Sequence, residues 1–312
     1  MIHVENLTKY YDGLCAVDRI NLDIQKGEIL GLLGPNGAGK TTTLRMLTGY
    51  FMPTSGSIRI KDYSIYEDVV EIKKLIGYLP ESAPLYHNML VYDYLDYIAK
   101  VSGFEKDEKN ARIRFLSDSC GLNGIMHNTI NELSRGFNQR VGIAHAMMSD
   151  PEILILDEPT SGLDPNQIVE IRDIIRQIGQ EKTVILSTHI LSEVEAVCDR
   201  VVIINKGKII VDDRTDNLKQ SVGKEHLIHL SLLNADFMSV KTQLDSIDGI
   251  VGIEQLNDEK DGKLNIRLVS KSDTDLRKDV YQAIKQTDWV MVEFYQEKKT
   301  LEAIFRELTK ET

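Results

Sequence analysis

Residues 34 to 41 read Gly34-Pro35-Asn36-Gly37-Ala38-Gly39-Lys40-Thr41 and fit the pattern G-x-x-x-x-G-K-[ST] in full. The glycines let the backbone curl until successive N–H groups point at one phosphate chain. In this pattern the lysine reaches the β- and γ-phosphates and the next hydroxyl binds Mg²⁺, so these roles fall to Lys40 and Thr41. The stretch therefore predicts a site for a nucleoside triphosphate, with contacts that extend from Gly34 through Thr42.

The sequence on both sides supplies the structural context that this pattern needs. An apolar run over 28–33 predicts a buried strand before it, and helix-forming residues follow over 42–47. Further short apolar runs predict strands over 153–156, 183–187 and 201–204. Strands that alternate with helices favour an α/β fold with a mainly parallel sheet covered on both faces. This context argues against a chance glycine turn.

The composition of the 312 residues is typical of a soluble globular protein. Hydrophobic residues make up 42% and charged residues 27%, and no apolar run approaches the roughly 18 residues of a membrane span. The N-terminus lacks the basic and hydrophobic segments of a secretory signal. The net charge of −11 argues against broad affinity for nucleic acid, although it leaves room for a local basic patch. We expect a cytoplasmic protein that contacts a membrane only through a partner.

Three cysteines, Cys15, Cys120 and Cys198, are far apart in the chain and odd in number. Their spacing is not that of metal ligands, and such cysteines suit a reducing compartment. Free cysteine is usually buried and unreactive, so we expect all three to be small core residues.

The patterns predict two domains, over 1–215 and 216–312. Within the first domain, apolar residues recur at helical spacing, which predicts a mostly helical insert over about 87–150. In the second domain the predicted elements follow the order β-α-β-β-α-β plus a closing helix, which is typical of a small ferredoxin-like α+β domain. The helices of this domain are expected over 240–247, 276–286 and 301–310.

The second domain offers no sign of a catalytic site of its own. It carries neither a glycine-rich loop nor a cluster of histidine, cysteine and carboxylate residues. Its 14 basic and 18 acidic residues give no positive surplus for binding nucleic acid. We therefore expect a regulatory or docking module.

Two carboxylates follow the apolar run at 153–156. A carboxylate at the end of a strand beside the phosphate loop can hold Mg²⁺, and that role falls to Asp157. Glu158 is then expected on the γ-phosphate side, where a base or water-orienting group is needed for in-line attack. Many strands end in charged residues, so this interpretation depends on the phosphate loop upstream.

Residues 133 to 140 read L-S-R-G-F-N-Q-R. Ser134 suits the cap of the helix that follows and Gly136 permits close approach of the backbone, so with Arg135 they predict a second anion site. The pattern L-S-x-G-x-x-Q-R is the signature of ABC ATPases, which this chain resembles. In that family the signature binds the γ-phosphate held by another subunit. The resemblance implies that ATP is enclosed between two copies of the chain, or between it and a paralogous subunit.

Further stretches resemble motifs of the same family, in the family's order. Residues 161–164 are similar to the D-loop, which implies that Asp164 contributes to the nucleotide site. His189 is similar to the switch histidine that contacts the γ-phosphate, and the resemblance implies Glu158, His189 and Lys40 as catalytic residues. Tyr11 is similar to the aromatic residue that stacks on adenine, with the adjacent Tyr10 as the alternative.

One position departs from the family's pattern. The glutamine of the Q-loop falls on Glu81, in the stretch G-Y-L-P-E at 77–81. Glutamine offers a neutral carbonyl and an amide, whereas glutamate is a charged acceptor only. We expect Glu81 to ligate Mg²⁺ beside Thr41 and Asp157, and its extra negative charge near the γ-phosphate to slow hydrolysis.

The resemblance covers residues 1 to about 215 and implies a P-loop NTPase of the ABC ATPase fold. It is nearest to the ATP-binding subunits of bacterial multidrug, gliding and copper-enzyme-maturation exporters. Those often read L-E-D-V-F near their C-terminus, where this chain has L-E-A-I-F at 301–305. The resemblance implies an ATPase that uses ATP and Mg²⁺ and powers export through a separate integral membrane permease, at the cytoplasmic face of the bacterial inner membrane.

Two other functions remain open. One is a soluble ABC ATPase that acts on ribosomes or DNA, but such proteins usually fuse two cassettes or insert a long coiled coil. This chain has one cassette, no sustained heptads and an acidic balance, and we expect no nucleic-acid partner. The other is an importer ATPase, whose added C-terminal domain is generally β-barrel-like rather than ferredoxin-like.

Overall fold

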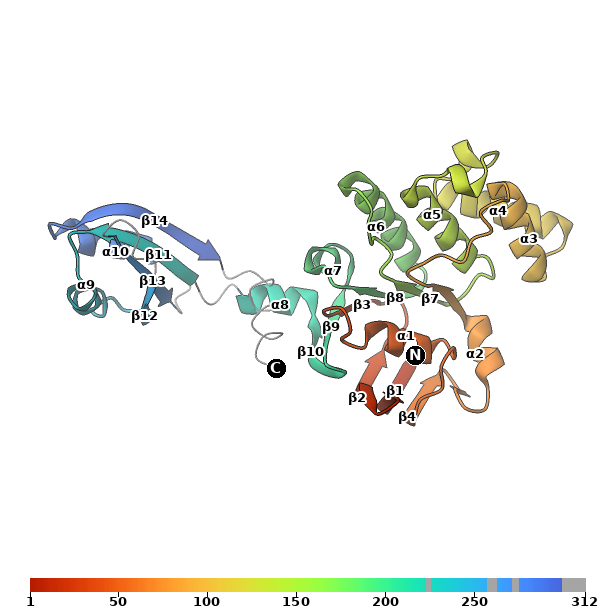
Figure 1. Cartoon of the computed structure of the whole chain (residues 1–312), viewed down its shortest axis with the longest axis horizontal. Coiled ribbons are helices and arrows are strands. Elements are labelled where there is room, and N and C mark those ends of the chain that lie inside the picture. Colours follow the sequence, from red (N-terminus) through yellow and green to blue (C-terminus); the bar gives the residue numbers. More distant parts are fainter. Residues whose placement is uncertain (223–225, 257–262, 271–274, 299–312) are drawn as a thin grey trace. The chain divides into compact units, whose positions relative to one another are not determined.

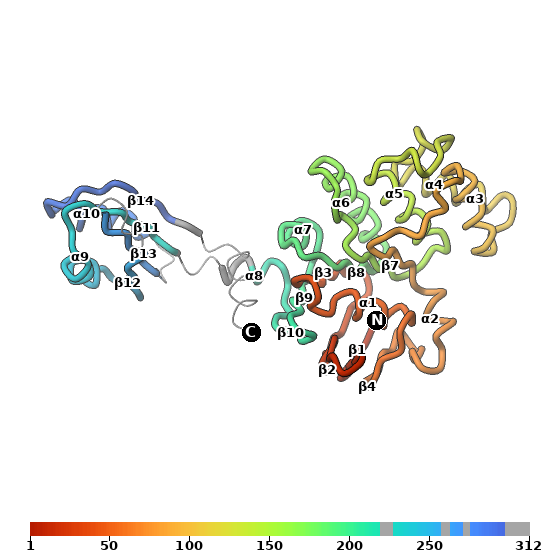
Figure 2. Tube along the Cα trace, in the orientation of Figure 1, coloured from red at the N-terminus to blue at the C-terminus, as the bar shows by residue number. Residues whose placement is uncertain are grey.

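The structure is a computed structural model, and the chain forms two compact units, Met1–Thr215 and Asp216–Thr312. Figure 1 shows the elements of both units and Figure 2 traces the backbone. Among the described helices, none is both long and apolar enough to cross a membrane. The helix expected over 301–310 and the L-E-A-I-F stretch within it lie outside the described residues. The structure describes residues 1–222, 226–256, 263–270 and 275–298.

The first unit is built on a mainly parallel sheet, as the sequence predicts. Its central strands are runs of leucine, isoleucine and valine that are buried on both faces, as expected for strands with covered faces. A turn after Asn205 returns the chain antiparallel along one edge. In order across the sheet, the six strands within Met1–Thr215 are β10 (Lys208–Arg214), β9 (Arg200–Asn205), β3 (Ile29–Leu33), β8 (Thr183–Thr188), β7 (Ile153–Asp157) and β6 (Ile76–Leu79).

Helices cover one face of this sheet (Figure 1). They are α5 (Arg135–Ala146), α6 (Pro165–Gly179) and α7 (Leu191–Val197). Helix α6 begins abruptly because the Asp164 carboxylate accepts hydrogen bonds from the backbone N–H groups of Asn166 and Gln167. This cap fixes where the loop after Glu158 ends.

A second sheet and α1 (Lys40–Leu47) cover the opposite face. The first strand of this sheet starts with alternating buried and exposed side chains, as antiparallel strands with one solvent face do. Its buried Ile2 and Val4 share one apolar core with Leu44 of α1 and Ile155 of the main sheet. The sequence pattern predicts strands here but not a separate antiparallel sheet. In order, the strands are β2 (Leu14–Ile24), β1 (Ile2–Tyr11), β4 (Ser55–Ile60) and β5 (Tyr63–Ser64).

The region expected to be mostly helical, about 87–150, is mostly helical. The residues whose spacing predicts them are largely buried, including Val91, Leu95, Ile113 and Leu116. The elements of the insert are α3 (Val91–Val101), α4 (Lys106–Ser119), η1 (Asn123–Ile125) and η2 (Ile130–Glu132), which lead into α5. A separate helix, α2 (Val69–Leu75), lies before the insert and precedes strand β6.

The three cysteines are free thiols. Cys120 and Cys198 are buried, as expected of small core residues, whereas Cys15 is only half-buried. Burial raises the pKa of the Cys120 thiol to about 12, because the thiolate would lose its hydration in the apolar interior. Cys120 therefore stays protonated at neutral pH, which suits a packing role.

The second unit has the predicted order β-α-β-β-α-β among its described residues. Its four strands are all antiparallel to their neighbours, and two helices pack on one face through Val240, Leu244 and Val280. The helix expected over 240–247 starts and ends earlier, because Asp236 caps it by accepting from the N–H of Ser239. The elements are α8 (Thr215–Val222), β11 (His226–Leu233), α9 (Phe237–Leu244), β12 (Ile250–Leu256), β13 (Leu264–Ser270), α10 (Arg277–Lys285) and β14 (Val290–Lys298), with the strands ordered β12-β13-β11-β14.

Close packing of β6 against the end of α5 makes one glycine necessary. A Cβ on Gly77 would lie 2.1 Å from the carbonyl oxygen of Ala146, a backbone atom that cannot rotate away. We expect Gly77→Ala to lower the free energy of unfolding of the first unit by about 2–3 kcal/mol, since the strand and helix must separate. Urea denaturation measures this loss. Gly124→Ala is the control, because nothing lies within 4 Å of its Cβ position, and equal midpoints for both variants would contradict the prediction.

Candidate nucleotide site

The glycine loop lies between β3 and α1 and has no room for side chains at two positions. A Cβ on Gly34 would lie 2.2 Å from the carbonyl oxygen of Ile204, and one on Gly39 would lie 2.5 Å from that of Ala16. Gly39 also has φ +108°, which side chains rarely adopt. The loop borders a cleft of about 330 Å³, lined by Ala16, Asn36, Gly37, Ala38, Gly39, Lys40, Thr41, Thr42, Glu81, Glu158, Ser161 and His189.

Lys40 lies at the base of this cleft and is 5% exposed. Its ammonium donates to the carbonyl oxygens of Gly34 (2.8 Å) and Pro35 (3.3 Å). It also forms an ion pair with Glu158, with 3.2 Å between Nζ and Oε1. The ammonium is thus held by the loop that surrounds it, at the start of α1, where the backbone N–H groups point into the cleft.

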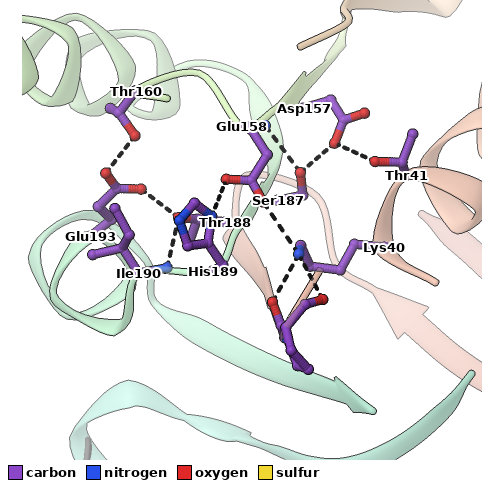
Figure 3. A network of polar contacts seen from close by, with 12 residues as sticks. Lys40, Thr41, Asp157, Glu158, Thr160, Ser187, Thr188, His189, Ile190 and Glu193 are labelled. Carbon is purple, nitrogen blue, oxygen red and sulfur yellow. Dashed lines mark hydrogen bonds and ion pairs between the residues drawn. The ribbon is translucent and has the colours of Figure 1, made fainter. Parts of the chain in front are cut away.

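Asp157, at the end of β7, faces Thr41 across the cleft floor (Figure 3). Its Oδ1 accepts from the hydroxyls of Thr41 (3.0 Å) and Ser187 (2.5 Å). Its Oδ2 is buried and has no hydrogen-bond partner among the described residues. A buried carboxylate oxygen without a partner carries a desolvation cost that a cation would offset. The donor set of hydroxyl and carboxylate oxygens therefore fits Mg²⁺.

Glu158 is held from both sides. It is 8% exposed and has φ +49°, an unusual backbone conformation for a non-glycine residue. Its N–H donates to the carbonyl (3.2 Å) and the hydroxyl (3.0 Å) oxygens of Ser187, which keeps the backbone in this turn. Its Oε2 lies 2.8 Å from Nδ1 of His189 and its Oε1 pairs with Lys40. The carboxylate is therefore pointed into the cleft by two groups of the site itself (Figure 3).

A second buried carboxylate, which the sequence interpretation missed, lies beside this group. Glu193 on α7 accepts hydrogen bonds from the hydroxyls of Thr160 and Thr188, the latter at 2.5 Å. Thr188 in turn accepts from the N–H of Ile190 at 3.0 Å. Glu193 thus ties the turn after Glu158 to the residue before His189 (Figure 3). Its signal in the sequence is a charged residue on the apolar side of a short helix, next to Val194.

The residues of the signature lie off this cleft. Ser134 caps α5 by accepting from the N–H of Phe137 at 3.4 Å, as the sequence predicts. A Cβ on Gly136 would lie 2.6 Å from Cδ of Gln167 on α6, so the Gln167 side chain would have to move to admit one. Within Met1–Thr215, all of which is described, neither these residues nor Arg135 nor Asp164 line the cleft at Lys40.

The remaining two predicted residues differ in their placement. Glu81 lines the cleft and follows the end of β6 by two residues. Tyr11, at the end of β1, does not line it and is 37% exposed. Its ring packs edge-on against Phe51 at 6.0 Å between centroids, and the Lys9 ammonium lies 5.3 Å from its centroid. Its stacking on adenine stays a prediction.

Comparison with known proteins identifies the family of this chain. A family model described as ABC transporter matches residues 17–161, and a model of an AAA domain matches residues 129–195. The bacitracin transport ATP-binding protein BcrA of Bacillus licheniformis is 39% identical over 253 residues, which cover 80% of this chain and 81% of BcrA. The chain belongs to the ABC transporter ATP-binding family. As an ABC ATPase, it binds and hydrolyses ATP.

Other relatives and solved structures of ABC ATPases cover the first unit. The probable multidrug ABC transporter ATP-binding protein YbhF of Escherichia coli is 37% identical over 227 residues, covering 72% of this chain and 39% of YbhF. The structure of cbiO1 from Clostridium perfringens, part of the ABC transporter complex cbiONQ, superposes with TM-score 0.66 at 30% identity, over 71% of this chain and 92% of cbiO1. A dimeric, post-hydrolysis structure of the cassette MJ0796 with ADP and Pi has TM-score 0.63 at 25% identity, over 69% and 99%.

Proposed function

We propose that this ABC ATPase uses ATP and Mg²⁺ to power export through a separate integral membrane permease. The observation that carries the proposal is the convergence of Lys40, Glu158 and His189 on one cleft, with the predicted signature residues placed off it. A complete set of γ-phosphate contacts then requires a second subunit. The related cassette MJ0796 has a dimeric structure, which supports a second subunit.

The residues of the cleft have separate roles in the proposed hydrolysis. Lys40 neutralises charge on the β- and γ-phosphates, and Glu158 accepts the proton of the attacking water. His189 orients the Glu158 carboxylate and contacts the γ-phosphate. Asp157 and Thr41, with Glu81, would hold Mg²⁺, which would offset the negative charge of the phosphates.

In the proposed dimer, each ATP lies between the glycine loop of one protomer and Ser134–Gly136 of the other. Ser134, Arg135 and Gly136 would contact the γ-phosphate from the second side, and Asp164 would lie at the interface. Only the closed dimer offers both sets of contacts, so ATP shifts the balance towards closure. Hydrolysis removes the bridging γ-phosphate and reverses the shift.

Two observations support the proposed export role and membrane location: the names of the relatives and an exposed apolar surface after Glu81. The relatives named for bacitracin transport and for multidrug transport support a role in export at the cytoplasmic face of the bacterial inner membrane. The segment after Glu81 exposes several large apolar side chains, which suits a docking site for a permease. These side chains are Tyr86, Leu90, Tyr92 and Tyr97.

The alternative, a soluble ABC ATPase that acts on ribosomes or DNA, is less well supported. The net charge of −11 opposes binding to phosphate backbones, and the relatives carry transport names. An importer is also less well supported, because its added C-terminal domain is generally β-barrel-like, whereas the described residues of the second unit follow the order β-α-β-β-α-β.

Affinity purification from solubilised membranes of the source cell tests the proposal. We expect the tagged chain to retain a membrane protein with several spans, and the ATPase rate to rise when the two are reconstituted. Tyr92→Ser on α3 should weaken retention at least about tenfold, because exposed aromatic residues often dominate docking. Phe115→Ser, an exposed change on α4, is the matched control and should retain the partner. Retention of ribosomes or DNA in place of a membrane protein would favour the alternative.

A further inference from the structure

A buried hydrogen-bond chain links α5 to the segment that follows Glu81. The hydroxyl of Tyr94, on α3, lies 2.7 Å from Nδ1 of His145 on α5 and 3.2 Å from the carbonyl oxygen of Pro84. Tyr94 is 1% exposed, and burial raises the pKa of its phenol, so the hydroxyl keeps its proton. Three elements that are separate in sequence therefore meet at one hydroxyl.

The directions of these hydrogen bonds follow from the available donors. The Pro84 carbonyl only accepts, and the Tyr94 hydroxyl has a single proton to give. Both contacts are satisfied together only if Tyr94 donates to Pro84 and accepts from Nδ1–H of His145. Burial lowers the pKa of His145, which keeps its ring neutral at pH 7, with the proton on Nδ1.

Helix α5 also touches the same segment through a glycine. Gly142 lies one turn before His145, and a Cβ there would lie 2.7 Å from Cδ1 of Leu79 and 3.1 Å from Cβ of Ala83. Leu79 and Ala83 each lie two residues from Glu81, one on either side. The helix therefore packs against both flanks of Glu81, and the hydrogen-bond chain adds a polar contact one residue later.

We propose that Tyr94 and His145 are positioning residues for ATP hydrolysis, which fix the segment carrying Glu81 to the helix that begins after Ser134. This inference rests on the proposed roles of Glu81 and of the signature. Within Met1–Thr215, which is fully described, neither side chain lines the cleft, so both act through Glu81 rather than on the nucleotide. Since the signature faces the ATP of the opposite subunit in the proposed dimer, the same contacts connect the two nucleotide sites.

Removal of one hydroxyl tests this role in the full chain. Tyr94→Phe deletes the hydrogen bonds and keeps the ring, which packs edge-on against Tyr86 and His145. We expect kcat for ATP hydrolysis to fall at least about threefold while KM for ATP changes less than about twofold, because the phosphate contacts remain and only Glu81 is less well held. His145→Leu should have the same effect. His145→Asn, whose amide N–H can replace Nδ1–H, should restore at least about half of the wild-type kcat.

Tyr66→Phe is the matched control, because it also removes a hydroxyl that donates to a carbonyl oxygen, that of Gly56 at 2.8 Å, and Tyr66 does not line the cleft. Its kcat should equal that of the wild type. All rates are compared well below each variant's melting temperature, so that lost stability does not enter. The proposal is wrong if Tyr94→Phe has the kcat of Tyr66→Phe, if KM rises with kcat unchanged, or if His145→Asn is as slow as His145→Leu. Wild-type turnover that persists after Glu81→Ala would instead remove the role of Glu81 itself.

Discussion

Glu158→Gln is expected to reduce kcat for ATP hydrolysis by about 10³-fold and to leave ATP binding intact, since glutamine cannot accept the proton of the attacking water. The amide is close in shape to the carboxylate, so the contact with Nδ1 of His189 and the unusual backbone turn can persist. Because the γ-phosphate stays in place, we also expect a stable dimer in the presence of ATP and Mg²⁺. Phosphate release measures the rate, and light scattering measures the mass.

The matched control for this variant is Glu152→Gln, whose carboxylate pairs with Lys61 at 2.5 Å and does not line the cleft. It should hydrolyse ATP at the wild-type rate and show no ATP-induced dimer that outlasts turnover. Wild-type turnover by Glu158→Gln would remove Glu158 from the role of base. A slow Glu158→Gln variant that stays monomeric with saturating ATP would support Glu158 as the base but contradict a nucleotide site shared between two subunits.

Lys40→Ala should weaken the affinity for ATP at least about 100-fold, because a buried cation that pairs with phosphate is lost. The effect is enlarged by Glu158, whose carboxylate would then face the triphosphate without the ammonium 3.2 Å away. Isothermal titration calorimetry with ATP and Mg²⁺ measures the affinity.

Lys26→Ala serves as the control for the loss of one positive charge, since Lys26 is exposed and lies outside the cleft lining. Its affinity should stay within about twofold of the wild type, because an exposed charge is screened by salt. Equal affinities for both variants would overturn the assignment of the phosphate loop.

The parts of the site that could be predicted are those that depend on neighbours in sequence. The loop at Gly34–Thr41 needs glycine where the backbone of Ile204 comes close, and that requirement is visible as a pattern in one stretch. Asp157 and Glu158 follow from their place at the end of an apolar run. Family membership, shown by the relatives, agrees with an ATP-binding site, whereas the roles of the individual residues stay predictions.

Other features depend on contacts between distant residues, each ordinary by itself. Glu193 accepts hydrogen bonds from the hydroxyls of Thr160, 33 positions away, and Thr188, and no local pattern in the sequence indicates such a contact. The antiparallel sheet of β1, β2, β4 and β5 is similar, because the alternation of side chains predicts strands but not which strands pair. The bounds of α9 depend on a single capping contact at Asp236, which outweighs the periodicity that placed it three residues later.

In the proposed mechanism, the ion pair between Lys40 and Glu158 puts the Glu158 carboxylate in competition with the substrate for the Lys40 ammonium. An incoming phosphate oxygen competes with Oε1 of Glu158, 3.2 Å from Nζ, for the same ammonium. As the phosphate gains that contact in the proposed mechanism, Oε1 of Glu158 loses its ion-pair partner and becomes available to accept a hydrogen bond from the attacking water. In the proposed mechanism, binding of the triphosphate thus frees the acceptor that its hydrolysis needs, whereas a ligand without a terminal phosphate would leave the ion pair in place.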